Sequence, residues 1–122
     1  MKKVAFICVH NSCRSQIAEA LCKILRKELI AYSAGTKIKK LINNDAVRIM
    51  KEKYNINMDE QYPKLLSDIP KCDIYISMGC NVECPFIGKS FDVDFQIEDP
   101  TGKSDDDFLK AIESIKEKIL NI

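Results

Sequence analysis

The sequence lacks a long apolar stretch and an excess of either charge. No apolar run approaches the roughly 18 residues that a membrane span requires. The 19 basic and 18 acidic side chains leave a formal net charge of +1, so nothing favours nucleic acid or an acidic membrane as a partner. The apolar run that follows Met1-Lys2-Lys3 is short and is broken by His10 and Asn11, which predicts no signal peptide.

Histidine is also scarce, with one residue in 122, whereas cysteine is plentiful, with six. Such a cysteine count indicates either a disulfide framework or reactive thiols in a reducing compartment. The framework suits small secreted chains that lack a core, but 46% of these residues are hydrophobic and their pattern predicts a core. We therefore expect catalytic thiols in the cytoplasm, within a single domain over residues 1–122 that acts as a monomer.

The hydrophobic pattern predicts strands that alternate with helices. Val4–Val9 is a near-continuous apolar run, typical of a strand that is buried on both faces of a parallel sheet. Asn44 and Ser104 are expected to cap two of the helices. Further strands are expected over residues 29–34, 73–78 and 91–95, and helices over residues 13–28, after Asn44, within 63–70 and after Ser104. This order predicts an α/β fold with a parallel sheet, whose ligand lies at the carboxyl ends of the strands.

The strongest chemical signal is Cys-Val-His-Asn-Ser-Cys-Arg-Ser, residues 8–15, between the first strand and the first helix. Backbone N–H groups in such a loop, together with the helix N-terminus, can surround an anion. The Arg14 guanidinium suits a tetrahedral oxyanion. The same positive field favours Cys8 as a thiolate, and Ser15 can donate a hydrogen bond to its sulfur. The predicted oxyanion cradle comprises Val9, His10, Asn11, Ser12, Cys13 and Arg14. The alternative is a chance spacing around an inert, buried Cys8.

A nucleophilic thiol also requires a proton donor for the leaving oxygen. Asp99, before Pro100 in a loop after the last predicted strand, is the candidate acid. His10 invites pairing with Cys8, but two residues after the nucleophile its ring can equally line the loop or face solvent.

Cys80 and Cys84 form a second thiol group, on a segment with the character of a loop. Their spacing permits a local disulfide if the loop bends. Zinc bound by this pair with Cys8 and His10 is the rival interpretation. It is disfavoured because the sequence offers no second Cys-x-x-Cys or histidine pair, and because ligation would consume the nucleophile.

Taken together, these motifs resemble the low-molecular-weight protein tyrosine phosphatase family. The resemblance includes Cys8-x5-Arg14-Ser15, Tyr32-Ser-Ala-Gly35 and Glu98-Asp-Pro-Thr-Gly102, and it covers nearly the whole chain. Cys80, Cys84 and the stretch Asn11–Gln16 resemble its redox branch, the thioredoxin-coupled arsenate reductases. The resemblance implies a three-layer α/β/α sandwich with a four-stranded parallel sheet and no cofactor.

The resemblance also implies a mechanism. Cys8 attacks arsenate that is bound by the loop amides and Arg14, and Asp99 protonates the departing hydroxide. Cys80 then attacks Cys8 and releases arsenite, and Cys84 takes over the disulfide as a Cys80–Cys84 pair that thioredoxin reduces. A glutaredoxin-like donor can serve the same disulfide.

The chain departs from the family pattern in three places. His10 stands where glycine is more common, and the gap between Cys80 and Cys84 is short. Some members bind potassium at positions that match Asn11, Glu19 and Ser33, but the fourth position is Lys64, so we expect no metal site. The runner-up function is a tyrosine phosphatase that uses Cys8, Arg14 and Asp99, with low phosphatase activity expected in either case. A third possibility is a non-enzymatic sensor of oxyanions or metals.

Overall fold

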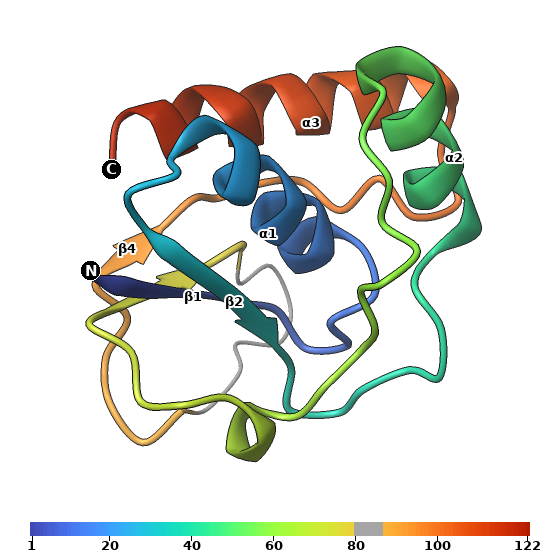
Figure 1. Cartoon of the computed structure of the whole chain (residues 1–122). Helices are drawn as coiled ribbons and strands as arrows, with labels where there is room; N and C mark the ends of the chain where they lie inside the picture. Colours follow the sequence, from blue (N-terminus) through green and yellow to red (C-terminus); the bar gives the residue numbers. More distant parts are fainter. Residues whose placement is uncertain (80–86) are drawn as a thin grey trace.

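Four strands form one parallel sheet in the computed structural model, which describes residues 1–79 and 87–122 (Figure 1). The strands are β1 (Lys3–Ile7), β2 (Ile30–Ala34), β3 (Ile74–Ser77) and β4 (Val93–Asp94), in the order β2-β1-β3-β4. β1 is central: it pairs with β2 from Lys3↔Ile30 to Ile7↔Ala34, and with β3 on its other side. The predicted four-stranded parallel sheet is confirmed, although β4 has only two residues.

The sheet is covered on both faces. Helices α1 (Arg14–Leu25), α2 (Asn44–Tyr54) and α3 (Asp105–Leu120) lie above it in Figure 1, and the 3₁₀ helix η1 (Leu66–Asp68) lies below. Successive strand residues point to opposite faces, so Phe6 packs in the core with the helices and Ile7 in the smaller cluster with η1. No helix in the described part of the chain combines the length and apolar character needed to cross a membrane.

Two local expectations are wrong. The N-cap of α2 is Asn43, not Asn44, since the Asn43 side chain accepts a hydrogen bond from the Ala46 amide at 3.0 Å. The predicted helical segment after Pro63 shrinks to the three residues of η1.

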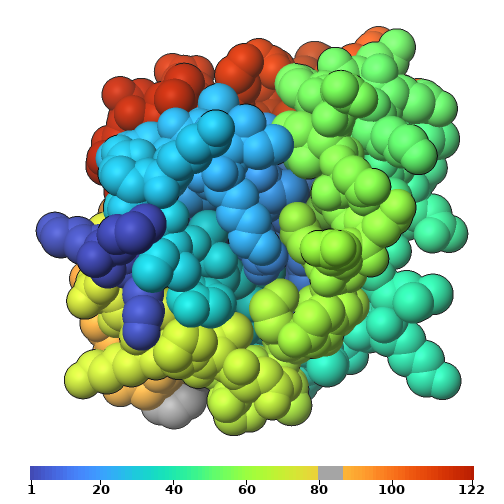
Figure 2. Space-filling view, viewed as in Figure 1, coloured from blue at the N-terminus to red at the C-terminus, as the bar shows by residue number. Residues whose placement is uncertain are grey.

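The site is positioned by the parallel arrangement of the strands. Cys8 directly follows β1, Gly35 directly follows β2, and Gly79 comes two residues after β3. Asp99 lies five residues beyond β4. The carboxyl ends of parallel strands meet at one edge of a sheet, so these segments converge there. The segment between α2 and η1 lies beside α1 on the surface of the molecule (Figure 2).

We predict that Ile112→Ala lowers the free energy of unfolding by about 2–5 kcal/mol, because it leaves a cavity where Ile112 is fully buried. Leu120→Ala, in the same helix, is the matched control, since Leu120 is 51% exposed and should change stability by less than about 1 kcal/mol. Urea unfolding of both variants measures the difference. Equal losses would show that α3 does not pack as described.

Candidate active site

The loop between β1 and α1 is held from outside by its carbonyl groups. The Val9 carbonyl accepts hydrogen bonds from the amides of Thr36 and Lys37, each at 3.0 Å. The His10 carbonyl accepts from Lys39 at 3.2 Å. Further along, the Ser12 carbonyl accepts from Asn43 at 2.7 Å, and the Asn11 carbonyl accepts from the side chain of Gln16 at 3.1 Å.

This arrangement makes the inside of the loop a source of N–H groups. In a trans peptide the N–H points away from the carbonyl of the same plane. The carbonyl groups of residues 9–12 point outward and accept hydrogen bonds from the surrounding protein. The N–H groups of residues 10–13, which share these peptide planes, therefore point the other way, toward the inside of the loop. α1 then begins at Arg14 without a side-chain cap, so its first amides add to the same positive field.

The pocket at this loop has the size of one small ion. Its volume is about 40 Å³, far below the 300–1,000 Å³ of typical sites for drug-sized ligands. A larger, more open hollow of about 200 Å³ also touches Asp99, but it contains neither Cys8 nor Arg14. The small pocket is lined by Cys8, Val9, His10, Ser12, Cys13, Arg14, Lys39, Asp99 and Thr101.

Arg14 is fixed by contacts from distant parts of the chain. Its Nη1 donates a hydrogen bond to the Ile97 carbonyl at 2.8 Å. Gly79, with φ +145°, lets the guanidinium approach, because a Cβ atom there would lie 2.9 Å from Nη1. Within the described residues, the bond to Ile97 is the one hydrogen bond that the guanidinium donates, so its other donors can face the pocket. The role of Arg14 in binding an oxyanion stays a prediction.

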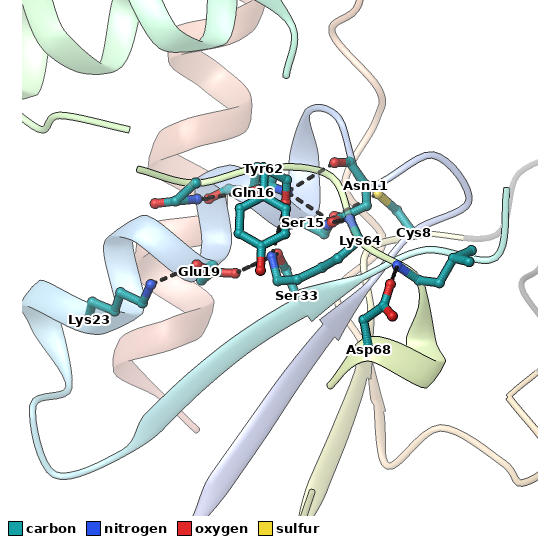
Figure 3. Close-up of polar contacts among 12 residues, drawn as sticks. Cys8, Asn11, Ser15, Gln16, Glu19, Lys23, Ser33, Tyr62, Lys64 and Asp68 are labelled. Carbon is teal, nitrogen blue, oxygen red and sulfur yellow. Dashed lines mark hydrogen bonds and ion pairs between the residues drawn. The ribbon is translucent and has the colours of Figure 1, made fainter. Parts of the chain in front are cut away.

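The Cys8 sulfur lies 2.8 Å from the Ser15 hydroxyl, and both residues are buried (Figure 3). The Ser15 oxygen accepts a hydrogen bond from Asn11 Nδ2 at 2.8 Å. Its hydroxyl hydrogen is therefore free to point at the sulfur. The geometry thus brings Cys8 and Ser15 together in the way that the sequence predicts.

Asn11 organises the loop from behind the pocket, a role that sequence analysis missed. It has φ +49°, a conformation that asparagine tolerates better than most residues, and it is fully buried. Its Oδ1 accepts hydrogen bonds from Gln16 Nε2 and from the Lys64 amide, both at 2.9 Å. Its side chain faces this scaffold and not the oxyanion pocket, so only its backbone N–H can serve the predicted cradle.

Gly35 is the second feature that sequence analysis read incompletely. Sequence analysis named it only within a motif, and its φ is not in the left-handed region, so backbone conformation does not call for glycine there. Glycine is needed because the loop approaches this position closely. A Cβ atom at Gly35 would lie 2.5 Å from the Val9 carbonyl oxygen and 3.0 Å from that of Cys8. Glycine therefore allows the chain after β2 to pass directly against the loop.

A buried charge network lies beside the loop. Glu19 accepts hydrogen bonds from Ser33 at 2.6 Å and from Lys23 at 2.7 Å, and Lys64 lies 3.3 Å from the same carboxylate (Figure 3). Burial alone would raise the pKa of Glu19, but the hydrogen bonds from Lys23 and Ser33 and the charge of Lys64 outweigh it and hold this pKa below its usual value.

The Lys64 ammonium lies beside Glu19 and Ser33, two of the positions that the resemblance relates to potassium binding in some family members. It contacts Glu19, Ser33 Oγ at 3.5 Å and the Tyr62 carbonyl at 3.1 Å. Within residues 1–79 and 87–122, no group of three or more His, Cys, Asp or Glu side chains is arranged to hold a metal ion.

Asp99 lines the same pocket as Cys8 although the two residues are far apart in the sequence. Its carboxylate accepts hydrogen bonds from the amide and the hydroxyl of Thr101, at 3.1 and 2.7 Å, which fixes the turn that carries it. Cys13 lies close by and is buried. Burial, and then the charge of Asp99, raise the pKa of the Cys13 thiol to about 12. Cys13 is therefore a thiol at neutral pH and lines the pocket as a neutral group.

The remaining candidates divide into two groups. His10 Nδ1 lies 2.8 Å from the Lys37 carbonyl, so Nδ1 carries the hydrogen and the ring ties the loop to the segment after β2. Its contribution to oxyanion binding stays a prediction. Cys80 and Cys84 lie outside the described residues, so their predicted roles stay predictions as well.

The family model of low molecular weight phosphotyrosine protein phosphatases matches residues 3–122. The chain belongs to this family. The chain is also 32% identical to a glutaredoxin arsenate reductase from Synechocystis sp., with 100% of this chain and 96% of the relative covered.

Two solved structures of arsenate reductases have a fold similar to that of this chain. An arsenate reductase in the phosphate binding state superimposes with a TM-score of 0.85 at 32% identity, covering 99% of this chain and 95% of the other. A thioredoxin-dependent arsenate reductase from Corynebacterium glutamicum has a TM-score of 0.75 at 32% identity, covering 99% of this chain and 59% of the other.

We predict that the stability contribution of Glu19 depends on pH. Its folded-state pKa is depressed, so the contribution is complete above the unfolded value of about 4.3 and is lost as pH falls through the lower folded value. Glu19→Gln should therefore cost about 3 kcal/mol at pH 7, since it leaves the half-buried Lys64 ammonium without its carboxylate partner. Urea unfolding at several pH values measures this cost.

The matched control is Glu52→Gln, which removes an exposed carboxylate paired with Arg48 at 3.5 Å and should cost less than about 1 kcal/mol. The Glu19→Gln cost should shrink as pH falls from 5 toward 3. A cost that is the same at pH 7 and pH 3 would contradict the described network.

We predict that Cys13 and Cys22 resist alkylation by iodoacetamide in the native protein at pH 7.5. Both are buried, and burial raises their pKa values to about 12 and about 11. Only a thiolate reacts at a useful rate. Mass spectrometry of the labelled peptides checks this, with the unfolded protein as the control in which both react. Rapid labelling of native Cys13 would show that the loop is not packed as described.

Proposed function

We propose that this protein reduces arsenate to arsenite by a thiol relay from Cys8 to Cys80 and then to Cys84. The observation that carries the proposal is the Cys8 sulfur, hydrogen-bonded to Ser15, in a pocket that fits one small oxyanion. The family membership and the names of the relatives support it. The presence of Cys80 and Cys84 supports it further, because hydrolysis of a phosphate ester needs neither thiol.

In the first step, Cys8 attacks the arsenic atom of arsenate, and a sulfur–arsenic bond forms as one oxygen leaves. The inward amides and the Arg14 guanidinium neutralise charge on the remaining oxygens. Asp99, which lines the same pocket, gives its proton to the leaving hydroxide, so that water departs.

In the second step, the Cys80 thiolate attacks the Cys8 sulfur. A Cys8–Cys80 disulfide forms, the electron pair of the sulfur–arsenic bond stays on arsenic, and As(III) leaves as arsenite. Cys84 then attacks Cys80 and restores the Cys8 thiolate. The two thiols at Cys80 and Cys84 have thus supplied two electrons, and the product is their disulfide.

A dithiol protein of the thioredoxin class completes the cycle by reducing the Cys80–Cys84 disulfide. The name of the Corynebacterium glutamicum relative supports thioredoxin, and that of the Synechocystis relative supports glutaredoxin. Either donor provides the two electrons and two protons that each turnover consumes.

The second candidate function is hydrolysis of phosphotyrosine, which the family name favours. It needs only Cys8, Arg14 and Asp99. Thr101 lines the pocket beside Asp99 and offers no aromatic surface for a substrate ring. We therefore expect phosphatase activity only as a weak side reaction.

We predict that Cys8→Ser, Cys80→Ser and Cys84→Ser each lower multiple-turnover arsenate reduction at least about 100-fold, because each removes an obligatory thiol. NADPH oxidation with thioredoxin and thioredoxin reductase measures the rate. Cys72→Ser is the matched control: Cys72 is buried outside the pocket, and its replacement should leave turnover within about twofold.

An aryl phosphate assay on the same variants separates the two functions. Weak hydrolysis should be lost in Cys8→Ser and kept in Cys80→Ser and Cys84→Ser. Full arsenate reduction by both Cys80→Ser and Cys84→Ser would refute the relay, and vigorous hydrolysis of the aryl phosphate would favour the phosphatase.

A further inference from the structure

The segment after β2 carries a concentration of positive charge beside the pocket. Residues 29–44 contain Lys37, Lys39 and Lys40 and no aspartate or glutamate. Of these three lysines, only Lys39 lines the oxyanion pocket. The segment around residue 40 projects from the surface in Figure 2, so its side chains reach solvent.

The backbone of this segment is fixed against the loop. The Thr36 and Lys37 amides donate to Val9, the Lys39 amide donates to His10 at 3.2 Å, and the His10 ring donates to Lys37. Because Lys39 is anchored to a residue of the cradle itself, its side chain starts at the rim and can turn toward an ion in the pocket.

Within residues 1–79 and 87–122, the Lys39 ammonium forms no ion pair with a carboxylate. Several other basic side chains already form ion pairs with carboxylates, while Lys39 has no such partner there. The paired residues are Lys23, Arg26, Arg48, Lys64 and Lys103.

The pocket needs a second cation for the chemistry proposed above. A divalent oxyanion there meets an attacking thiolate at Cys8, and the carboxyl of Asp99 adds negative charge whenever it is ionised. Arg14 supplies one full positive charge to the lining. A second charge at the rim lowers the repulsion that the oxyanion meets as it enters and raises its local concentration.

We propose that Lys39 is an oxyanion-binding residue that recruits divalent tetrahedral anions to the pocket. This inference rests on the proposed function, because it assigns a further binding group to the same site. Lys39 contributes through charge from the rim, so its effect falls on binding more than on the chemical step and weakens as salt screens it.

The test compares Lys39→Gln with Lys40→Gln in a Cys8→Ser background, with inorganic phosphate as the probe. Lys40→Gln is the matched control, because Lys40 is its neighbour and lies outside the pocket lining. Calorimetric titration at low salt should show a dissociation constant about fivefold higher for Lys39→Gln and less than about twofold higher for Lys40→Gln. Lys39→Arg should restore binding, and 0.5 M NaCl should largely remove the difference.

Arsenate reduction by the same substitutions in the protein with Cys8 intact separates this inference from the proposed function. Lys39→Gln should raise KM about fivefold and change kcat by less than about twofold. The inference is overturned if Lys39→Gln binds phosphate as tightly as Lys40→Gln, or if its weaker binding does not depend on the salt concentration. Neither result would contradict the proposed arsenate reduction. If the phosphate deficit appears but the wild type does not reduce arsenate, the proposed function fails and Lys39 remains an oxyanion residue. Absence of phosphate binding in the Cys8→Ser parent and of arsenate reduction in the wild type overturns both.

Discussion

The site depends on one constraint, which is that the loop after β1 presents its carbonyls to the protein and its amides to the pocket. Residues 36–43 and the side chain of Gln16 supply the donors that turn the carbonyls outward. Gly35 makes this possible, since any larger residue would press a Cβ atom against the Val9 carbonyl. The loop therefore keeps its shape because a separate segment surrounds it, and this shape is the one that the proposed oxyanion binding requires.

The position of this loop also depends on the pairing of the strands that precede it and lie beside it. β1 and β2 pair in register up to Ile7 and Ala34, so Cys8 and Gly35 leave the sheet side by side. Behind the loop, Asn11 joins Ser15 to the Lys64 backbone, and the Lys64 ammonium ends in the ion pair with Glu19. Buried polar groups of this kind are costly unless each is satisfied. Here every buried side-chain nitrogen and oxygen in the described residues has a partner, so the network holds the loop in one shape.

The parts of the site that could be predicted from sequence are those encoded locally. Cys8, Arg14 and Ser15 lie within eight residues of one another, and a strand before them and a helix after them fix their geometry. Asp99 was found from its place after the last strand, and the structure puts it in the lining of the same pocket. The sheet was predicted from apolar runs that alternate along the chain with segments of helical spacing, because such patterns indicate which residues are buried.

What escaped prediction depends on contacts across long stretches of chain. The bond between Asn11 and the Lys64 amide spans 53 positions, and that between Arg14 and Ile97 spans 83. No local sequence pattern predicts hydrogen bonds between residues so far apart in the chain. The N-cap of α2 was misplaced for a different reason: two adjacent asparagines have the same propensity, and only tertiary geometry chooses Asn43.

The most direct test of the account follows the thiols through one turnover. Fully reduced protein is mixed with one equivalent of arsenate without any reductant, quenched by acid, alkylated and mapped by peptide mass spectrometry. The account predicts one equivalent of arsenite, a Cys80–Cys84 disulfide and an alkylated Cys8, with a Cys8–Cys80 disulfide trapped in Cys84→Ser. Arsenite formed without any disulfide among these three cysteines, or with a disulfide that excludes Cys80, would contradict it.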